Sequence, residues 1–166
     1  YDEHIWTSLR NAGELSAAIA DTLGELDPAR AAAYTANAAA YSEQLNDLDA
    51  RYAAAVEAAP SRTLLFADRF PFRYLADDYG LSYYAAFSGC SAESEASFET
   101  VAFLADKTAA LDLPAVLTIE GSDGRIAQTV VQSAGGDRPV LTLNAMQGTM
   151  ADGATYLSVM EKNLTV

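Results

Sequence analysis

Apolar residues in the first third of the chain recur at helical spacing and predict two consecutive helices. In the first helix they lie three or four residues apart: Leu9, Ala12, Leu15, Ile19, Leu23 and Leu26. Thr7 or Ser8 is a suitable N-cap, because a hydroxyl oxygen there can accept from an unpaired backbone N–H. Asp27-Pro28 then restarts the chain, with Asp27 as the next N-cap and Pro28 at the first helical position.

The second predicted helix carries one uninterrupted apolar stripe and ends before Pro60. Its apolar positions alternate in steps of four and three residues: Tyr34, Ala38, Tyr41, Leu45, Leu48, Tyr52 and Val56. A helix over residues 28–58 is roughly 45 Å long at a rise of 1.5 Å per residue, so it can run along a whole domain and beyond. Such a stripe requires a partner surface.

After Pro60 the pattern changes to short apolar strands that alternate with helices. The predicted strands are 63–67, 81–87, 115–120 and 140–144. The predicted helices are 70–79, which ends at Gly80, and 98–111, 123–134 and 151–164. Alternation with short links indicates a parallel sheet that is covered on both faces. The sequence therefore predicts an α/β fold, a four-stranded parallel sheet flanked by helices and preceded by two helices, the second a long backbone helix.

Length and composition limit the class of protein. A chain of 166 residues fits one domain with a real core, and it contains no run of 18 apolar residues that could span a membrane. The net charge of −13 argues against nucleic acid and against anionic membrane surfaces as partners, although an acidic surface mildly concentrates cations. No initiator Met or leader pattern is present, so we expect Tyr1 to begin a piece of a longer protein.

Motifs typical of enzymes are missing from the sequence. It has no Gly-x-Ser-x-Gly elbow, no phosphate-binding Gly-x-x-x-x-Gly-Lys and no dinucleotide-binding Gly-x-Gly-x-x-Gly after the first strand. Cys90 is the only cysteine, so it forms no internal disulfide. The catalytic alternative is a triad of Cys90, His4 and Asp68, because residues far apart in the sequence can converge in space. We expect a protein that is not an enzyme.

Polar residues follow the predicted strands at the edge where ligands bind in parallel sheets. These strand ends carry Asp68, Glu120 and Asn144, and the segment 88–90. Asp68 is equally well read as a helix N-cap. Asn144 offers only a neutral carbonyl oxygen, which suits hard cations better than zinc. His4 is the only histidine, and a lone histidine is more often hydrogen-bonded than a metal ligand.

Three segments resemble a known family. They are Tyr1-Asp-Glu-His-Ile-Trp6, the run from Phe66 to Leu81 that contains Phe-Pro-Phe-Arg-Tyr-Leu, and the loop Gly89-Cys-Ser-Ala-Glu-Ser-Glu-Ala-Ser97. Together they resemble the zinc and manganese substrate-binding proteins of bacterial ABC transporters. The resemblance covers nearly the whole chain, and the Phe-Pro-Phe-Arg-Tyr variant looks like the zinc branch. It implies that residues 1–166 form the C-terminal lobe and the linking helix of a two-lobe protein whose N-terminal lobe is absent.

The resemblance implies roles for individual residues. His4 matches a metal-coordinating histidine, and Trp6 matches a tryptophan that packs beneath the site. In the loop after the first strand Arg69 stands opposite the usual ligand, but an arginine keeps its proton and cannot coordinate. Asp68, one residue earlier, is the plausible ligand there, and Arg69 can instead pair with a carboxylate such as Glu120. The resemblance gives Glu120 a supporting role.

Two further loops depart from the family pattern. Cys90 replaces an aliphatic residue and is expected to be a small buried apolar side chain. Ser97 is the natural N-cap of the next helix, and Glu93 and Glu95 are expected to be capping or solvated. Asn144 stands where the family often has Asp. The expected metal ligands are therefore His4, Asp68 and Asn144, completed by a histidine from the other lobe.

The sequence therefore predicts an extracytoplasmic receptor that captures a divalent metal ion and delivers it to the permease of an ABC importer. Zn²⁺ is favoured, and Mn²⁺ is the alternative because carboxylate and amide oxygens are hard ligands. The protein is expected at the cell surface or in the periplasm, attached to the membrane only through a lipid anchor outside this segment. A second hypothesis is an adhesion or surface-binding module with a degenerate metal site, favoured by Arg69 and Asn144.

Overall fold

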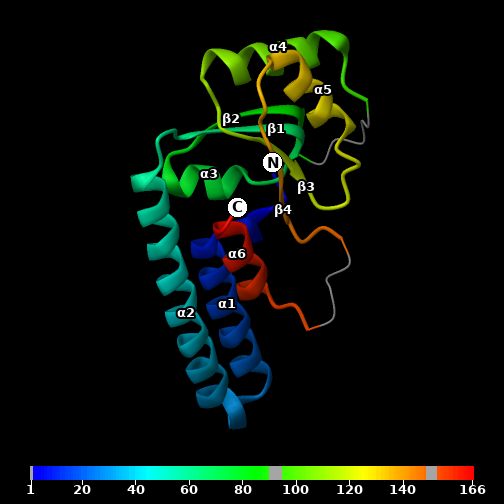
Figure 1. Ribbon diagram of the computed structural model, residues 1–166. Helices are drawn as coiled ribbons and strands as arrows, with labels where there is room; N and C mark the ends of the chain where they lie inside the picture. Colours follow the sequence, from blue (N-terminus) through cyan, green and yellow to red (C-terminus); the bar gives the residue numbers. More distant parts are fainter. Residues whose placement is uncertain (1, 90–94, 149–152) are drawn as a thin grey trace.

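A long helical hairpin precedes the α/β part of the chain in the computed structural model, which describes residues 2–89, 95–148 and 153–166 (Figure 1). The hairpin consists of α1 (Leu9–Leu26) and α2 (Ala31–Ala58), joined by the 3₁₀ turn η2 (Pro28–Arg30), and a second 3₁₀ turn, η1 (Ile5–Thr7), precedes α1. As predicted, Ser8 caps α1, accepting from the backbone N–H of Asn11. None of the helices in the described ranges is long and apolar enough to cross a membrane.

Asp27 is the N-cap residue and Pro28 opens the turn, as predicted, but the Asp27 side chain does not cap the helix. The side chain accepts no capping hydrogen bond, and the helix that starts at Pro28 is a 3₁₀ turn before it becomes α2. The Asp27 carboxylate accepts instead from Arg30 Nε, at 2.6 Å, and from the Tyr34 hydroxyl, at 3.3 Å. Arg30 and Tyr34 thus hold the Asp27 carboxylate through Oδ2.

Four parallel strands form the sheet, as the alternating pattern predicts. They are β1 (Thr63–Phe70), β2 (Ser82–Ser88), β3 (Val116–Ile119) and β4 (Val140–Leu143), in the order β2-β1-β3-β4. The connecting helices are α3 (Arg73–Tyr79), α4 (Phe98–Ala110) and α5 (Arg125–Ala134), and α6 (Tyr156–Leu164) closes the chain. Ser97 caps α4 through Thr100 N–H, and Gly80 ends α3 with a φ of 63°, both as expected.

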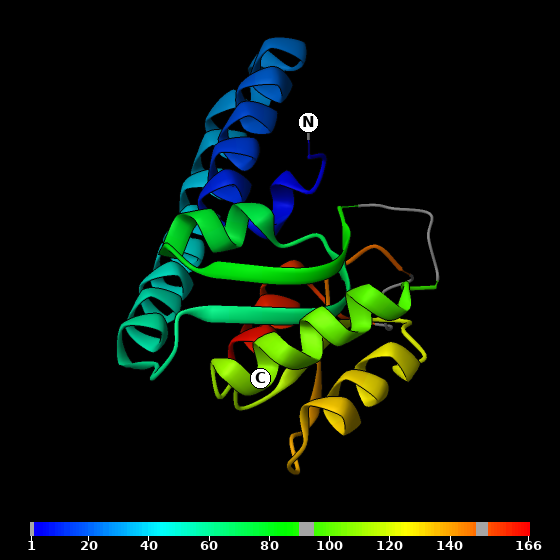
Figure 2. The same cartoon turned by 90° about the horizontal axis from the view of Figure 1, so that it is seen from above.

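Helices cover both faces of this sheet (Figures 1 and 2). The hairpin, α3 and α6 enclose one core, to which Leu45, Phe66, Phe72 and Met160 contribute fully buried side chains. On the opposite face α4 and α5 cover a second core. β1 serves both cores because successive side chains point to opposite faces of a strand: Phe66 belongs to the first core, and Leu65 and Ala67 to the second.

β1 is longer than predicted, and this changes the place of Asp68. The strand continues to Phe70, with Arg69 paired to Phe87 of β2, so Asp68 lies inside the strand and not in a loop after it. α3 begins at Arg73, three residues later than predicted, after the N-cap residue Phe72. The reading of Asp68 as a helix N-cap is therefore wrong.

Hydrogen bonds tie the first residues of the chain to the α/β part. The Thr7 hydroxyl donates to the carbonyl oxygens of His4 and Pro71, and the Ser8 hydroxyl donates to Asp78 Oδ2 at 2.6 Å. Thr7 and Ser8 are completely buried. The N-terminal segment is thereby held between α3 and α6, beside the carboxyl ends of the strands, which is where the sequence placed candidate ligands.

Candidate metal centre

His4 is completely buried, and a carboxylate fixes the orientation of its ring. His4 Nδ1 lies 2.8 Å from Asp2 Oδ1, and the same oxygen accepts the backbone N–H of His4 at 3.0 Å. Because a carboxylate only accepts, the ring carries its proton on Nδ1 and presents a lone pair at Nε2. A carboxylate behind a histidine in this way is the usual support of a metal-binding imidazole.

Trp6 holds the His4 segment in place. Its ring packs edge to face against the His4 imidazole, with 5.4 Å between the ring centroids. The indole Nε1–H donates to the carbonyl oxygen of Ala145 at 2.9 Å, and the Trp6 carbonyl accepts from the Tyr156 hydroxyl at 2.8 Å. Burial raises the pKa of Tyr156, so its hydroxyl remains a donor. The resemblance implies this packing of Trp6 against the site.

Glu120 anchors the loop that follows β4. Its Oε2 accepts the backbone N–H of Ala145 and its Oε1 accepts that of Gln147, both at 2.8 Å. The side-chain amide of Gln147 in turn contacts His4 Nε2. The expected pairing of Arg69 with Glu120 is wrong for the described part of the chain, because both carboxylate oxygens serve the loop and no ion pair joins the two residues.

Asn144 shapes the same loop. Its Oδ1 accepts the backbone N–H of Met146 at 2.7 Å, which closes a turn in which Met146 has a φ of 60°. The side chain of Asn163 holds the Asn144 backbone on both sides, accepting from its N–H at 2.9 Å and donating to its carbonyl at 2.8 Å. A carbonyl oxygen has a second lone pair, so a ligand role for Asn144 stays a prediction.

Asp68 sits at an irregularity in β1. Between Phe66 and Arg69 the strand advances three residues while β2 advances two, from Ala85 to Phe87, so β1 carries one extra residue there. Asp68 is 8% exposed. Its Oδ1 accepts the backbone N–H of Arg69 at 2.8 Å, whereas its buried Oδ2 has no hydrogen-bond partner among the residues described.

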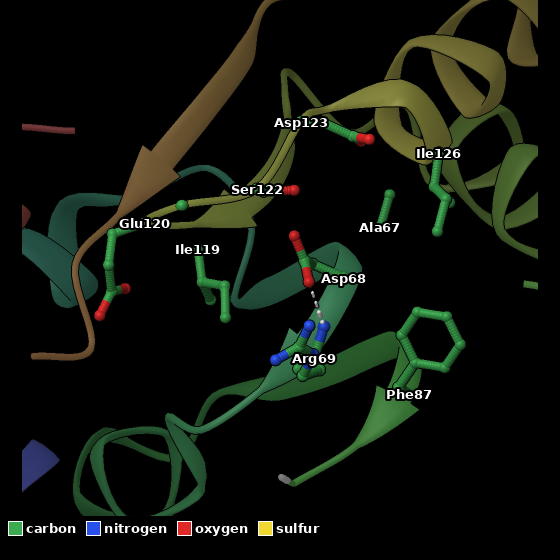
Figure 3. Close-up of a pocket in the computed structure, with 10 residues that line it drawn as sticks. Ala67, Asp68, Arg69, Phe87, Ile119, Glu120, Ser122, Asp123 and Ile126 are labelled. Atoms are coloured by element: carbon green, nitrogen blue, oxygen red, sulfur yellow. Dashed lines mark hydrogen bonds between the residues drawn. The ribbon is translucent and has the colours of Figure 1, made fainter. Parts of the chain in front are cut away.

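A cavity of about 280 Å³ lies at the carboxyl ends of β1 and β3, with Asp68 on its wall between Ser122 and Arg69 (Figure 3). Its lining residues are Ala67, Asp68, Arg69, Phe87, Ile119, Glu120, Gly121, Ser122, Asp123 and Ile126. At its rim, hydrogen bonds from the backbone and then the side chain of Arg125 lower the pKa of the exposed Asp123 carboxyl. His4 and Asn144 do not line the cavity.

The structure thus groups the candidate residues into two clusters. One, the His4 cluster, consists of Asp2, His4, Trp6 and Gln147; the other, the Asp68 cluster, consists of Asp68 and Arg69 with their cavity. Glu120 belongs to both.

Sequence reasoning did not single out Asp2, although an acidic residue two positions before a histidine was the available signal. One ligand atom each from Asp2, Glu3 and His4 lie within 4.8 Å of one another. The roles expected for Cys90 and Glu93 fall outside the described residues, and Glu95 is exposed.

Known proteins match this chain along nearly its whole length. The family model described as "Zinc-uptake complex component A periplasmic" (ZnuA) matches residues 1–166. The zinc-binding lipoprotein AdcA of Streptococcus pneumoniae strain R6 is 33% identical over 168 residues, a match that covers 99% of this chain and 33% of that protein. The chain therefore spans about a third of the length of the AdcA proteins and about half of the ZnuA protein of Brucella abortus that it matches.

Solved structures match the fold closely. The laminin-binding protein Lmb of Streptococcus agalactiae, described as a bifunctional protein with adhesin and metal-transporting activity, is 28% identical with a TM-score of 0.88. The Zn(II)-bound ZnuA-like domain of Streptococcus pneumoniae AdcA is 32% identical with a TM-score of 0.80. Each match covers 99% of this chain, but only 63% and 62% of the two structures.

Proposed function

Because the chain belongs to the family of the periplasmic zinc-uptake component ZnuA, we propose that its protein captures zinc outside the cytoplasm for an ABC importer. The observation that carries this proposal is the buried His4, whose Nδ1 is held by Asp2 so that Nε2 presents a lone pair. An orientation fixed in advance lowers the cost of ordering a metal ligand. The zinc-binding relatives support the choice of cargo.

The ligand set that we propose combines His4 with Asp68 and Asn144, completed by a residue from outside this segment. Imidazole and carboxylate suit zinc, whereas an amide oxygen is a weaker zinc ligand that manganese tolerates better. The Gln147 amide contacts the nitrogen that would coordinate, so this side chain has to move when metal binds. Binding therefore includes a rearrangement of the loop after β4.

Residues 1–166 form, in this proposal, the C-terminal lobe and the linking helix of a two-lobe protein. Apolar side chains on the outer part of α1 support it, because Ile19 and Leu26 are 59% and 78% exposed. A second lobe that packs on the hairpin would cover them. Hydrogen exchange on the full-length protein tests this contact. If the backbone amides of α1 exchange freely in the full-length protein, no second lobe packs on α1.

A chelator-competition titration of the full-length protein, first with zinc and then with manganese, tests the cargo. We expect tight, selective zinc binding that His4→Ala abolishes. Asn46→Ala, at an exposed position on α2, serves as the matched control and should bind as the unaltered protein does. Thermal unfolding of both variants checks that the fold survives. Binding no tighter than about 1 μM, unchanged by His4→Ala, contradicts the proposal.

That negative outcome would favour the second candidate, a surface-binding module. Gln147 contacts His4 Nε2, which supports it, and Arg69 stands where the resemblance implies a ligand. The relative Lmb is described as both adhesin and metal transporter, so the two functions are compatible in one fold. Binding of the full-length protein to a laminin-coated surface tests this candidate directly. If it is a metal-independent adhesin, the His4→Ala variant should bind the surface as well as the unaltered protein does.

Location and partners complete the proposal. We place the full-length protein outside the cytoplasm, at the surface or in the periplasm, with a lipid anchor beyond this segment and the permease of the importer as its partner. Fractionation of cells with and without detergent tests the anchor.

An enzyme that uses Cys90 as its nucleophile is the alternative from another functional class. An alkylation rate of the Cys90 thiol no faster than that of a free cysteine would exclude it.

A further inference from the structure

Two buried polar atoms at the cavity are without partners in the described part of the chain. They are Oδ2 of Asp68, an acceptor, and Nε of Arg69, a donor. Buried polar atoms are almost always hydrogen-bonded, because an unpaired one has lost its bond to water and gained none in return. Neither residue belongs to an ion pair in the ranges that the structure describes. Such atoms beside a cavity point to a ligand that supplies what is missing.

The extra residue in β1 explains why two consecutive side chains line one cavity. In a regular strand, Asp68 and Arg69 would point to opposite faces of the sheet. Here β1 advances three residues against two on β2, and Ala67, Asp68 and Arg69 all reach the cavity. Irregularities of this kind re-aim side chains near functional sites. The backbone therefore holds an anion and a cation next to each other.

The charges and hydrogen-bonding groups of Asp68 and Arg69 indicate which ligand fits the cavity. A zinc ion on Asp68 brings two positive charges beside the guanidinium of Arg69, and this repulsion is relieved when an anion lies between them. A guanidinium binds a carboxylate through two parallel N–H groups, and its Nε–H is one of them. The volume of about 280 Å³ is just below the range of roughly 300–1,000 Å³ typical of drug-sized ligands, so the anion is small.

We propose that the protein takes up zinc together with a small carboxylate anion, with the metal on Asp68 and a carboxylate group on Arg69. The inference rests on the proposed function and adds to it the form of the cargo. It also gives a role to Arg69, which cannot coordinate metal but stands where the resemblance implies a ligand. The anion would supply coordinating oxygens that this segment lacks.

The test is a zinc titration of the full-length protein at fixed free zinc, in a buffer without carboxylates, with and without about 1 mM citrate as the probe. At equal free zinc we expect citrate to raise zinc affinity about tenfold or more, the effect of one charge-assisted bidentate contact. By linkage, zinc raises the affinity for labelled citrate by the same factor in equilibrium dialysis.

Matched variants assign the effect to Arg69. Arg69→Gln should bind zinc without citrate but lose the citrate effect, and Arg69→Lys, which keeps the charge, should retain part of it. Arg73→Gln removes a mostly exposed arginine nearby and should leave the effect intact.

Zinc binding that citrate does not improve, or improves equally in Arg69→Gln, overturns this inference and leaves the proposed function standing. If zinc binds tightly neither with citrate nor without it, both this inference and the proposed function are overturned.

Discussion

Two polar clusters lie at the carboxyl edge of the same sheet, and they differ in how their polar atoms are satisfied. In the His4 cluster the imidazole contacts Asp2 on one side and Gln147 on the other. In the Asp68 cluster an acceptor of Asp68 and a donor of Arg69 are buried without partners among the described residues. The polar atoms of the first cluster are thus paired within the protein, whereas the second leaves an acceptor and a donor to which a ligand can bind.

The difference follows from the elements that carry the two clusters. The His4 segment is irregular, and it is held by long-range hydrogen bonds from Tyr74 to the Asp2 carbonyl and from Tyr156 to the Trp6 carbonyl. Asp68 and Arg69 belong to a strand, whose backbone ladder fixes where their side chains can go. A segment without a ladder can adapt until its polar atoms are paired, but a strand cannot.

Removing Glu120 should have the largest effect, because this residue links the two clusters. Glu120→Ala removes the acceptor of two backbone N–H groups, at Ala145 and Gln147. Bonds to a charged group contribute about 1.5–3 kcal/mol each, so we expect a loss of roughly 3 kcal/mol or more in the free energy of unfolding by urea. Asp123→Ala removes an exposed carboxylate from the same cavity and should cost far less. Equal losses would show that Glu120 does not anchor the loop.

Asp2→Asn should weaken zinc binding without unfolding the protein. It removes the carboxylate that orients His4, and the loss of such a supporting partner typically costs about 10–100-fold in metal affinity. Chelator competition on the full-length protein measures the change. Asp21→Asn, at an exposed position on α1, is the control. Unchanged affinity in Asp2→Asn would mean that His4 needs no support or binds no metal.

Asp68→Asn should lower zinc affinity with little change in stability without metal. The amide oxygen can still accept the Arg69 N–H, but the amide NH₂ is as buried and unpaired as the oxygen that it replaces, so we expect a change of no more than about 1 kcal/mol in the free energy of unfolding. Zinc affinity should fall, because a carboxylate ligand is lost. Thermal unfolding with chelator present, compared with zinc titration, measures both. A loss of several kcal/mol without metal would show that Asp68 is already satisfied in the free protein.

Gln147→Ala should have the smallest effect, a rise in zinc affinity of a few-fold. The amide of Gln147 contacts His4 Nε2, and zinc has to displace it. An ordinary hydrogen bond contributes about 0.5–1.5 kcal/mol net, which sets the scale of the gain. Gln44→Ala on the exposed face of α2 is the matched control. A fall in affinity would instead identify the Gln147 carbonyl as a ligand.

The sequence predicted the fold better than it predicted the site. Helical spacing, Ser8, Ser97 and Gly80 fixed the type and one end of several elements, because caps and apolar periods are local signals. The capping bond of the Asp27 side chain and the end of β1 were predicted wrongly. A competing arginine and an extra strand residue decided these positions, and neither has a local signal.

For the site, the sequence selected His4 through its neighbours and Asp68 through its place after apolar residues. It could not show that Asp2 supports His4, that Gln147 contacts Nε2, or that Glu120 serves the loop after β4 instead of Arg69. Each of these contacts depends on side-chain direction, which is set by packing between segments far apart in the chain.

The amino-acid order alone thus determined the number, type and sequence of the helices and strands, since hydrophobic period and capping chemistry act over a few residues. Only the tertiary structure decided which polar atoms are satisfied and which are left for a ligand. Gln147 reaches His4 across more than a hundred residues, and the extra residue in β1 turns Asp68 and Arg69 toward one cavity. Pairing of this kind depends on distances in space, and no local pattern encodes them.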